Sequence, residues 1–158
     1  MTDSGTDAKR YAFRLLSYRG RSESEIRERL GKKGFTGDVV AQTLDFLKGA
    51  GFIDDAALAL NLKRQAVEQK LLGHAAARLF MQRRGLPKDL VDATLGYNED
   101  EELQSARKLL DKKLRSVRDC LTIKERKRLY DFFARRGFAP AVIHRALRDI
   151  KFCEGDGE

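Results

Sequence analysis

The sequence predicts an all-α protein made of three tandem three-helix repeats, which together form an elongated and curved molecule. Apolar residues recur at helical spacing along the chain, and no stretch has the period-two alternation of β-branched residues that is typical of strands. The only prolines, Pro87 and Pro140, stand near expected helix starts, where a missing N–H does no harm. A repeat of about fifty residues indicates how many units there are.

Three glycines mark this repeat. Gly34, Gly85 and Gly137 stand 51 and 52 residues apart, and each closes a helix that carries two cations just before its end. An apolar pair follows each glycine after five and six residues, and a leucine follows after ten. The pairs are Val39-Val40, Leu90-Val91 and Val142-Ile143, and the leucines are Leu44, Leu95 and Leu147. These matches in phase indicate three copies of one supersecondary unit, similar to a helix-turn-helix.

Start and stop signals place three short helices in each repeat. The first repeat, residues 9–53, is expected to contain helices at 9–18, 22–33 and 37–50. The second, residues 54–98, contains them at 55–71, 73–84 and 87–97, and the third, residues 99–152, at 100–114, 123–136 and 140–151. Residues 1–8 and 153–158 are expected to be flexible ends.

Capping signals support several of these helix starts. Ser22 with Glu25, and Thr122 with Glu125, have the spacing of a capping box. The pair Asp54-Asp55 suits the N-terminus of a helix that begins near residue 56. Helices this short do not persist alone in water, so they must pack on one another.

Composition limits the class of protein. The 158 residues are 42% hydrophobic, which is enough for one compact domain or several small ones. Lys and Arg total 32 against 24 Asp and Glu, a formal net charge of +8, which favours an anionic partner such as nucleic acid, an acidic protein groove or a membrane surface. No apolar run approaches the ~20 residues of a membrane span, and the first residues lack the apolar stretch of a signal peptide. We therefore expect a cytoplasmic protein without a membrane partner.

Motifs for metal binding or catalysis are scarce. Cys120 and Cys153 lie far apart and outside any CxxC or Cys/His spacing, so the sequence predicts neither a disulfide framework nor a zinc site. His74 and His144 are the only histidines, too few for a His-based metal site or triad. Neither a GxxxxGK[ST] motif nor a nucleophile with a plausible partner occurs. We expect a binding protein that is not an enzyme and uses no cofactor or metal.

The cation pairs before the three glycines are the first candidate interaction residues. They are Lys32-Lys33, Arg83-Arg84 and Arg135-Arg136. Cations in a last helical turn stabilise the helix dipole by roughly 0.3–1 kcal/mol wherever they face, and for a single pair this explanation stands level with a binding role. Recurrence of the pair at one position in three repeats favours a basic stripe that matches a linear anionic partner.

The third repeat adds a dense group of cations. Two like-charged pairs, Lys108 with Lys112 and Lys124 with Arg128, are i, i+4 neighbours that destabilise a helix modestly, although a solvated face tolerates them. The concentration makes the C-terminal third the best candidate for contact with DNA phosphates or an acidic protein surface. The group comprises Arg107, Lys108, Lys112, Lys113, Arg115, Arg118, Lys124, Arg126, Lys127 and Arg128.

The segment Arg19-Gly20-Arg21-Ser22 enters the second helix. Its two arginines fit either a solvated turn or a clamp in which a guanidinium binds the carbonyls of neighbouring helices. We favour a structural role for this pair over a functional one.

Three sets of residues carry a resemblance to a known family. The first is Ala12, Leu15-Leu16, Arg19-Gly20-Arg21-Ser22-Glu23-Ser24-Glu25-Ile26, Leu30 and Lys33-Gly34-Phe35; the second is Gly51-Phe52-Ile53-Asp54-Asp55 with Ala59; the third is Arg135-Arg136-Gly137-Phe138 with Val142-Ile143 and Leu147. In this order, over residues 9–150, they resemble the RecX family, bacterial regulators of the RecA recombinase. The chain departs from the family's pattern at Leu58, at the pair Gly73-His74 and at Phe80.

The resemblance implies a function. Tandem three-helix modules would lie in the helical groove of a RecA–single-stranded DNA filament and lower its recombinase, ATPase and coprotease activities, by blocking extension or promoting disassembly. The implied role is a negative regulator of homologous recombination and DNA repair. The partners are the RecA filament and single-stranded DNA, with weak binding to double-stranded DNA, and we expect a monomer. The alternative is a helix-turn-helix protein that binds DNA directly.

Overall fold

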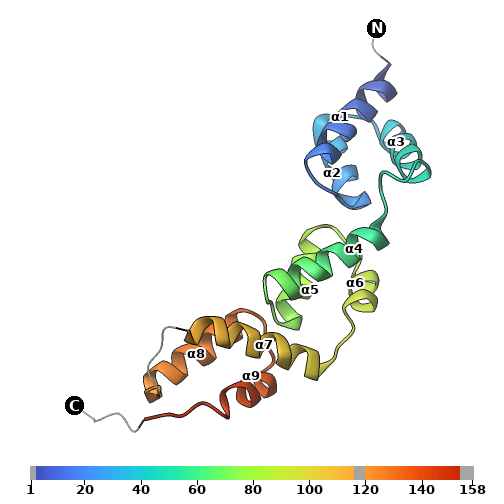
Figure 1. Ribbon diagram of the computed structural model, residues 1–158. Helices are drawn as coiled ribbons and strands as arrows, with labels where there is room; N and C mark the ends of the chain where they lie inside the picture. Colours follow the sequence, from blue (N-terminus) through green and yellow to red (C-terminus); the bar gives the residue numbers. More distant parts are fainter. Residues whose placement is uncertain (1–2, 116–119, 154–158) are drawn as a thin grey trace. The chain divides into compact units, whose positions relative to one another are not determined.

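A computed structural model describes residues 3–115 and 120–153 of the chain. Within these ranges the chain forms nine α-helices and one π-helical segment, and no strand (Figure 1). The prediction of an all-α fold is confirmed. None of the helices in the described part of the chain is both long and apolar enough to cross a membrane.

The chain divides into two compact units. The first contains the residues up to 62 together with 81–94, and the second contains 63–80 and the residues from 95 onward. The division passes through helix α4 (Asp55–Arg64) and helix α5 (His74–Arg83), so the middle three helices contribute to both units.

The first unit has its core among three helices. Helices α1 (Ser4–Tyr18) and α2 (Glu23–Lys33) both pack on α3 (Gly37–Gly49) (Figure 1). Helix α1 begins before the predicted residue 9, because the Asp3 carboxylate accepts a hydrogen bond of 3.2 Å from the Gly5 N–H. Helix α6 (Lys88–Leu95) belongs to the same unit except for its last residue. The main cluster of buried residues in this unit comprises Ala8, Ala12, Ile26, Leu30, Val40, Leu44, Leu47 and Ile53.

The second unit has a larger core. Helices α7 (Glu99–Leu114) and α8 (Ile123–Arg135) both pack on α9 (Pro140–Leu147). Thr122 and Glu125 form the complete capping box that the sequence predicts, so α8 has a firmly defined start. The buried core residues are Leu103, Ala106, Leu110, Leu121, Leu129, Phe133, Phe138, Val142, Ile143, Ala146 and Leu147.

The helix predicted at 55–71 is not continuous. Helix α4 ends at Arg64 and is followed by a π-helical segment, Gln65–Gln69, whose wider turn is closed by a 2.9 Å hydrogen bond from the Lys70 N–H to the Gln65 carbonyl. Leu71 then takes a positive φ of 50°, which ends the helical run. The Lys70 carbonyl is left to bind a partner elsewhere in the chain.

The structure contradicts the sequence prediction for the two cysteines. Cys120 and Cys153, which we expected not to pair, form a disulfide with their Cα atoms 5.6 Å apart. The Leu121 N–H donates to the Lys151 carbonyl at 3.1 Å, and the Cys153 N–H donates to the Leu121 carbonyl at 2.9 Å. The prediction was wrong because α9 returns the chain to the start of α8, and sequence spacing carries no information about that return.

Candidate functional site

In the first unit a glycine-ended helix docks on the start of another helix. Gly85, after the end of α5, has a φ of 82°, and a Cβ at this position would overlap the Oγ of the fully buried Ser22. Beside it the Arg84 guanidinium donates to the Gly20 carbonyl at 3.1 Å. Glycine is therefore required here both for its backbone conformation and for the close approach.

The second unit repeats this arrangement. Gly137, after α8, has a φ of 83°, and a Cβ there would overlap the backbone of Ala76 in α5. The Gly73 N–H donates to the Arg136 carbonyl at 2.9 Å, and the Arg136 guanidinium donates to the Lys70 carbonyl that the π-helical segment leaves exposed. We call these two contacts, of Arg84-Gly85 with residues 20–22 and of Arg136-Gly137 with residues 70–76, the Arg–Gly joints.

The joints separate the two members of each predicted arginine pair. Arg84 and Arg136 turn inward, and the Nε atom of each is buried without a hydrogen-bond partner. Burial, followed by the nearby Arg19, lowers the pKa of Arg84. Arg83 and Arg135 instead have exposed side chains. The first member of each pair is therefore the more exposed one.

The first repeat has the cation pair but no joint. Nothing lies within 4 Å of a Cβ built at Gly34, although its φ is 100°. Lys32 and Lys33 are exposed at the end of α2, and Lys32 forms an ion pair with Glu28, whose pKa it lowers by hydrogen bonding and charge. The Lys33 ammonium lies 5.7 Å from the centre of the Tyr11 ring.

The turn that receives the first joint is held by its own arginines. Arg21 donates from Nε to the Leu15 carbonyl at 3.1 Å, as expected for a structural clamp. Both Arg19 and Arg21 form ion pairs with Glu25. The Glu25 N–H donates to Ser22 Oγ at 3.1 Å, but its carboxylate is engaged by the arginines, so only half of the predicted capping box forms.

Helix α7 is charged oppositely at its two ends. Its first turn holds four acidic residues, of which Glu99 and Asp100 pair with Arg145 of α9. Its C-terminal half presents exposed cations, and no residue in the described ranges forms an ion pair with them. On a helical projection Lys113 lies apart from the other four. These cations are Arg107, Lys108, Lys112, Lys113 and Arg115.

Helix α8 extends the basic surface. Its cations are exposed, and within the described ranges none has an ion-pair partner. The Arg126 guanidinium lies 4.7 Å from the centre of the Phe152 ring. Arg118, which the sequence placed in the same group, lies outside the described residues. The α8 cations are Lys124, Arg126, Lys127, Arg128 and Arg135.

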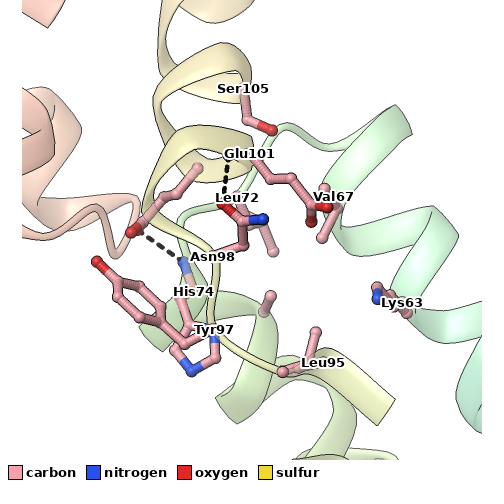
Figure 2. Close-up of a pocket in the computed structure, with 12 residues that line it drawn as sticks. Lys63, Val67, Leu72, His74, Leu95, Tyr97, Asn98, Glu101 and Ser105 are labelled. Atoms are coloured by element: carbon pink, nitrogen blue, oxygen red, sulfur yellow. Dashed lines mark hydrogen bonds between the residues drawn. The ribbon is translucent and has the colours of Figure 1, made fainter.

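A small cavity at the start of α7 surrounds a buried carboxylate that the sequence did not single out. Glu102 is 7% exposed, and its Oε1 atom accepts hydrogen bonds from the His74 N–H at 3.0 Å and the Ala139 N–H at 3.3 Å. These N–H groups begin α5 and α9, so one carboxylate caps two helices. Figure 2 shows the labelled rings of His74 and Tyr97 on one side of this cavity, with centroids 5.2 Å apart.

The residues of this cavity have a structural role. Burial, followed by the charge of Glu102, raises the pKa of Tyr97. The cavity volume is about 50 Å³, room for little more than a water molecule, which would satisfy the unpaired Oε2 of Glu102. Within the described ranges no group of three or more His, Cys, Asp or Glu side chains is arranged to hold a metal ion.

Comparison with known sequences identifies relatives. Two family models match: one described as RecX, first three-helix domain, over residues 8–47, and one described as RecX, third three-helix domain, over residues 99–147. A regulatory protein RecX of Deinococcus radiodurans is 34% identical over 144 residues, which cover 89% of this chain and 66% of the relative. One from Thermotoga petrophila is 33% identical over 140 residues, covering 89% and 82% respectively. One from Chlorobaculum tepidum is 30% identical over 138 residues, covering 87% and 84%.

Solved structures support the fold. The crystal structure of RecX from Lactobacillus salivarius has a TM-score of 0.79 at 16% identity and covers 94% of this chain and 97% of its own. A second crystal structure, of a regulatory protein RecX, has a TM-score of 0.74 at 24% identity and covers 93% of this chain and 72% of its own. At these identities the likeness concerns the fold alone.

Proposed function

The chain belongs to the RecX family, and on this premise we propose that it is a negative regulator of RecA that binds the RecA–single-stranded DNA filament. By lying in the filament groove it would block extension or promote disassembly and so lower the recombinase, ATPase and coprotease activities. We propose that it acts in the cytoplasm as a monomer.

The observation that carries this proposal is the set of exposed cations on α7 and α8 that have no ion-pair partner among the described residues. Charges that have no ion-pair partner within the described part of the chain remain available to phosphates or carboxylates. Contacts of such cations with DNA phosphates release condensed counterions, so affinity falls steeply with salt. We leave Arg84 and Arg136 out of the contact set because their guanidinium groups bind carbonyls of this chain. The proposed contacts are Lys32, Lys33, Arg83, Arg107, Lys108, Lys112, Lys113, Arg115, Lys124, Arg126, Lys127, Arg128 and Arg135.

A filament offers the same surface many times. A protein with basic residues in more than one helical repeat can use several of these surfaces at once, so modest contacts combine through effective concentration. Inhibition at a low ratio of protein to RecA is the expected consequence.

Titration against RecA filaments tests the proposal. The protein is added at near-physiological salt while single-strand-dependent ATP hydrolysis is followed, and binding to the same DNA without RecA is measured in parallel. Inhibition at concentrations too low to coat naked DNA supports filament binding. Inhibition that appears only when the DNA is saturated supports the alternative, direct DNA binding, which the same exposed cations also suit.

Two neighbouring arginines separate binding from folding. Arg135→Glu alters an exposed cation and is expected to weaken inhibition while lowering the melting temperature only slightly, because the cation in the last turn of α8 contributes about 0.3–1 kcal/mol through the helix dipole. Arg136→Glu breaks the joint with the Lys70 carbonyl and is expected to lower the melting temperature. If Arg135→Glu inhibits as well as the parent protein, Arg135 is not a contact residue.

A further inference from the structure

The α8 helix carries a second feature beside its cations, a pocket against the end of α7. Its lining combines an apolar floor with a charged rim, and its volume is about 420 Å³. That volume falls within the range of roughly 300–1,000 Å³ typical of ligand pockets. We call it the α7–α8 pocket; it is lined by Lys113, Leu114, Leu121, Glu125, Arg128, Leu129, Phe132 and Arg135.

The floor of the pocket is part of the core of the second unit. Leu129 and Leu121 are both buried in the core of the second unit. The backbone of Leu121 is held by hydrogen bonds to Lys151 and Cys153, and its neighbour Cys120 is tied to Cys153 by the disulfide. A preformed apolar surface binds a ligand at a lower entropic cost than one that must order first.

The rim of the pocket is positively charged. Lys113, Arg128 and Arg135 are exposed, and within the described part of the chain no carboxylate forms an ion pair with them. Glu125, the one acidic residue among the described residues of the lining, already accepts hydrogen bonds from Thr122, at 2.8 Å from its N–H and 3.0 Å from its hydroxyl. The rim therefore complements a ligand with several negative charges.

The aromatic residue of the pocket is not free to stack on a base. The Lys113 ammonium lies 4.0 Å from the centre of the Phe132 ring, and the Arg136 guanidinium lies 5.8 Å from it. The ring also packs against Phe133 in a T-shaped arrangement, with centroids 5.5 Å apart. Single-stranded nucleic acid binds in part by stacking its bases on open aromatic faces, and here the Lys113 ammonium stands over the ring. The leucines of the floor suit an aliphatic side chain.

We propose that the α7–α8 pocket binds an acidic peptide segment of a protein partner, with one apolar side chain of the peptide seated on Leu121 and Leu129 and its carboxylates on Arg128 and Arg135. This inference rests on the proposed function in one respect: the peptide segment is taken to belong to a protein that this regulator binds. It adds a specific protein contact to the general attraction of the basic surface.

A peptide assay without RecA tests the pocket separately. The probe is a fluorescein-labelled peptide in which a central Leu-Phe pair is flanked by runs of Asp and Glu, and its binding to the full chain is followed by fluorescence anisotropy. The control probes are the same peptide with Ser-Ser at its centre and a fluorescein-labelled oligo-dT of equal length. We expect the Ser-Ser peptide to bind about tenfold more weakly or worse, because the floor is then left without an apolar partner.

Two adjacent cations provide the matched variants. Arg128→Glu removes a rim charge, whereas Lys127→Glu makes the same charge change at a neighbouring exposed residue that does not line the pocket. Arg128→Glu is expected to lower the affinity for the Leu-Phe peptide about tenfold or more, which is the loss typical of a charge-assisted hydrogen bond. Lys127→Glu is expected to lower it much less. Arg135→Glu serves as a second rim variant if Arg128→Glu folds poorly.

Any one of three results would overturn the inference. The first is that the Ser-Ser peptide binds as tightly as the Leu-Phe peptide. The second is that Arg128→Glu and Lys127→Glu weaken peptide binding equally, and the third is that oligo-dT displaces the peptide and its own binding depends on Arg128 in the same way. The last result assigns the pocket to nucleic acid. These three results concern the peptide assay alone. Failure of the proposed function would show separately in the RecA titration, as the absence of inhibition at low protein concentration.

Discussion

Replacing Gly137 by alanine tests whether the Arg–Gly joint holds the second unit together. The matched control is Gly34→Ala, because Gly34 occupies the same place in the first repeat and also has a positive φ, but nothing lies within 4 Å of a Cβ built there. A second control, Gly96→Ala, lies in the same unit as Gly137 and also has open space around it.

The expected magnitudes differ because only one of these sites is crowded. A left-handed backbone costs an alanine roughly 1–2 kcal/mol, which is the whole penalty at the control sites. At Gly137 the new Cβ overlaps Ala76, so the joint must open as well. Opening removes two backbone hydrogen bonds, from Gly73 N–H to the Arg136 carbonyl and from Ala75 N–H to the Gly137 carbonyl, and the guanidinium bond of Arg136. At about 0.5–1.5 kcal/mol for each backbone bond and 1.5–3 for the charged one, the joint adds about 2.5–6 kcal/mol.

Urea denaturation and amide hydrogen exchange measure this difference. Gly137→Ala is expected to lower the free energy of unfolding by several kcal/mol and to remove the exchange protection of the Gly73 and Ala75 amides, while each control loses no more than about 2 kcal/mol. Equal losses in Gly137→Ala and Gly34→Ala, with the Gly73 and Ala75 amides still protected, would refute the reasoning.

Three further substitutions test other contacts. Cys153→Ser should lower the free energy of unfolding by about 3–4 kcal/mol, the value for a loop of this length, and abolish the effect of a reducing agent on the denaturation midpoint; no effect of reductant on the parent protein would contradict this. Thr122→Ala should cost about 1 kcal/mol, against almost nothing for Thr36→Ala, since the Thr36 side chain makes no capping bond; equal melting temperatures would exclude the cap. Burial raises the pKa of Asp55, which accepts from the Glu23 N–H, so the folded protein binds this proton more tightly than the unfolded chain. The stability advantage over Asp55→Asn should therefore be largest at acidic pH and decline as the pH rises through the folded pKa; an advantage that grows with pH would contradict the assignment.

Features that depend on neighbours along the chain were predictable. The Thr122 capping box needs only residues within one helical turn, and the glycines that follow α2, α5 and α8 all have the positive φ expected of a helix end. The repeat indicated the helical units for the same reason, since within each copy the apolar pair and the leucine that follows it have helical spacing.

Features that depend on contacts between distant segments of the chain could not be predicted from the sequence. Asp54 and Asp55 are adjacent and were expected to cap the same helix. The Asp54 carboxylate does accept from the Ala57 N–H in α4 at 3.0 Å, but Asp55 accepts from the Glu23 N–H that begins α2. Similarly, the buried position of Glu102 follows from the meeting of two helix starts, and no local pattern signals it.

The candidate interface shows both sides of this division. The sequence by itself determined that helices would form, where they would end, and that cations would gather before the glycines and in the third repeat, because propensity, capping and charge act over a few residues. Only the tertiary structure decided that Arg136 turns to the Lys70 carbonyl while Arg135 stays exposed, and that Cys120 meets Cys153. Those outcomes depend on which surfaces the packed helices bring together, and chain spacing does not encode that geometry.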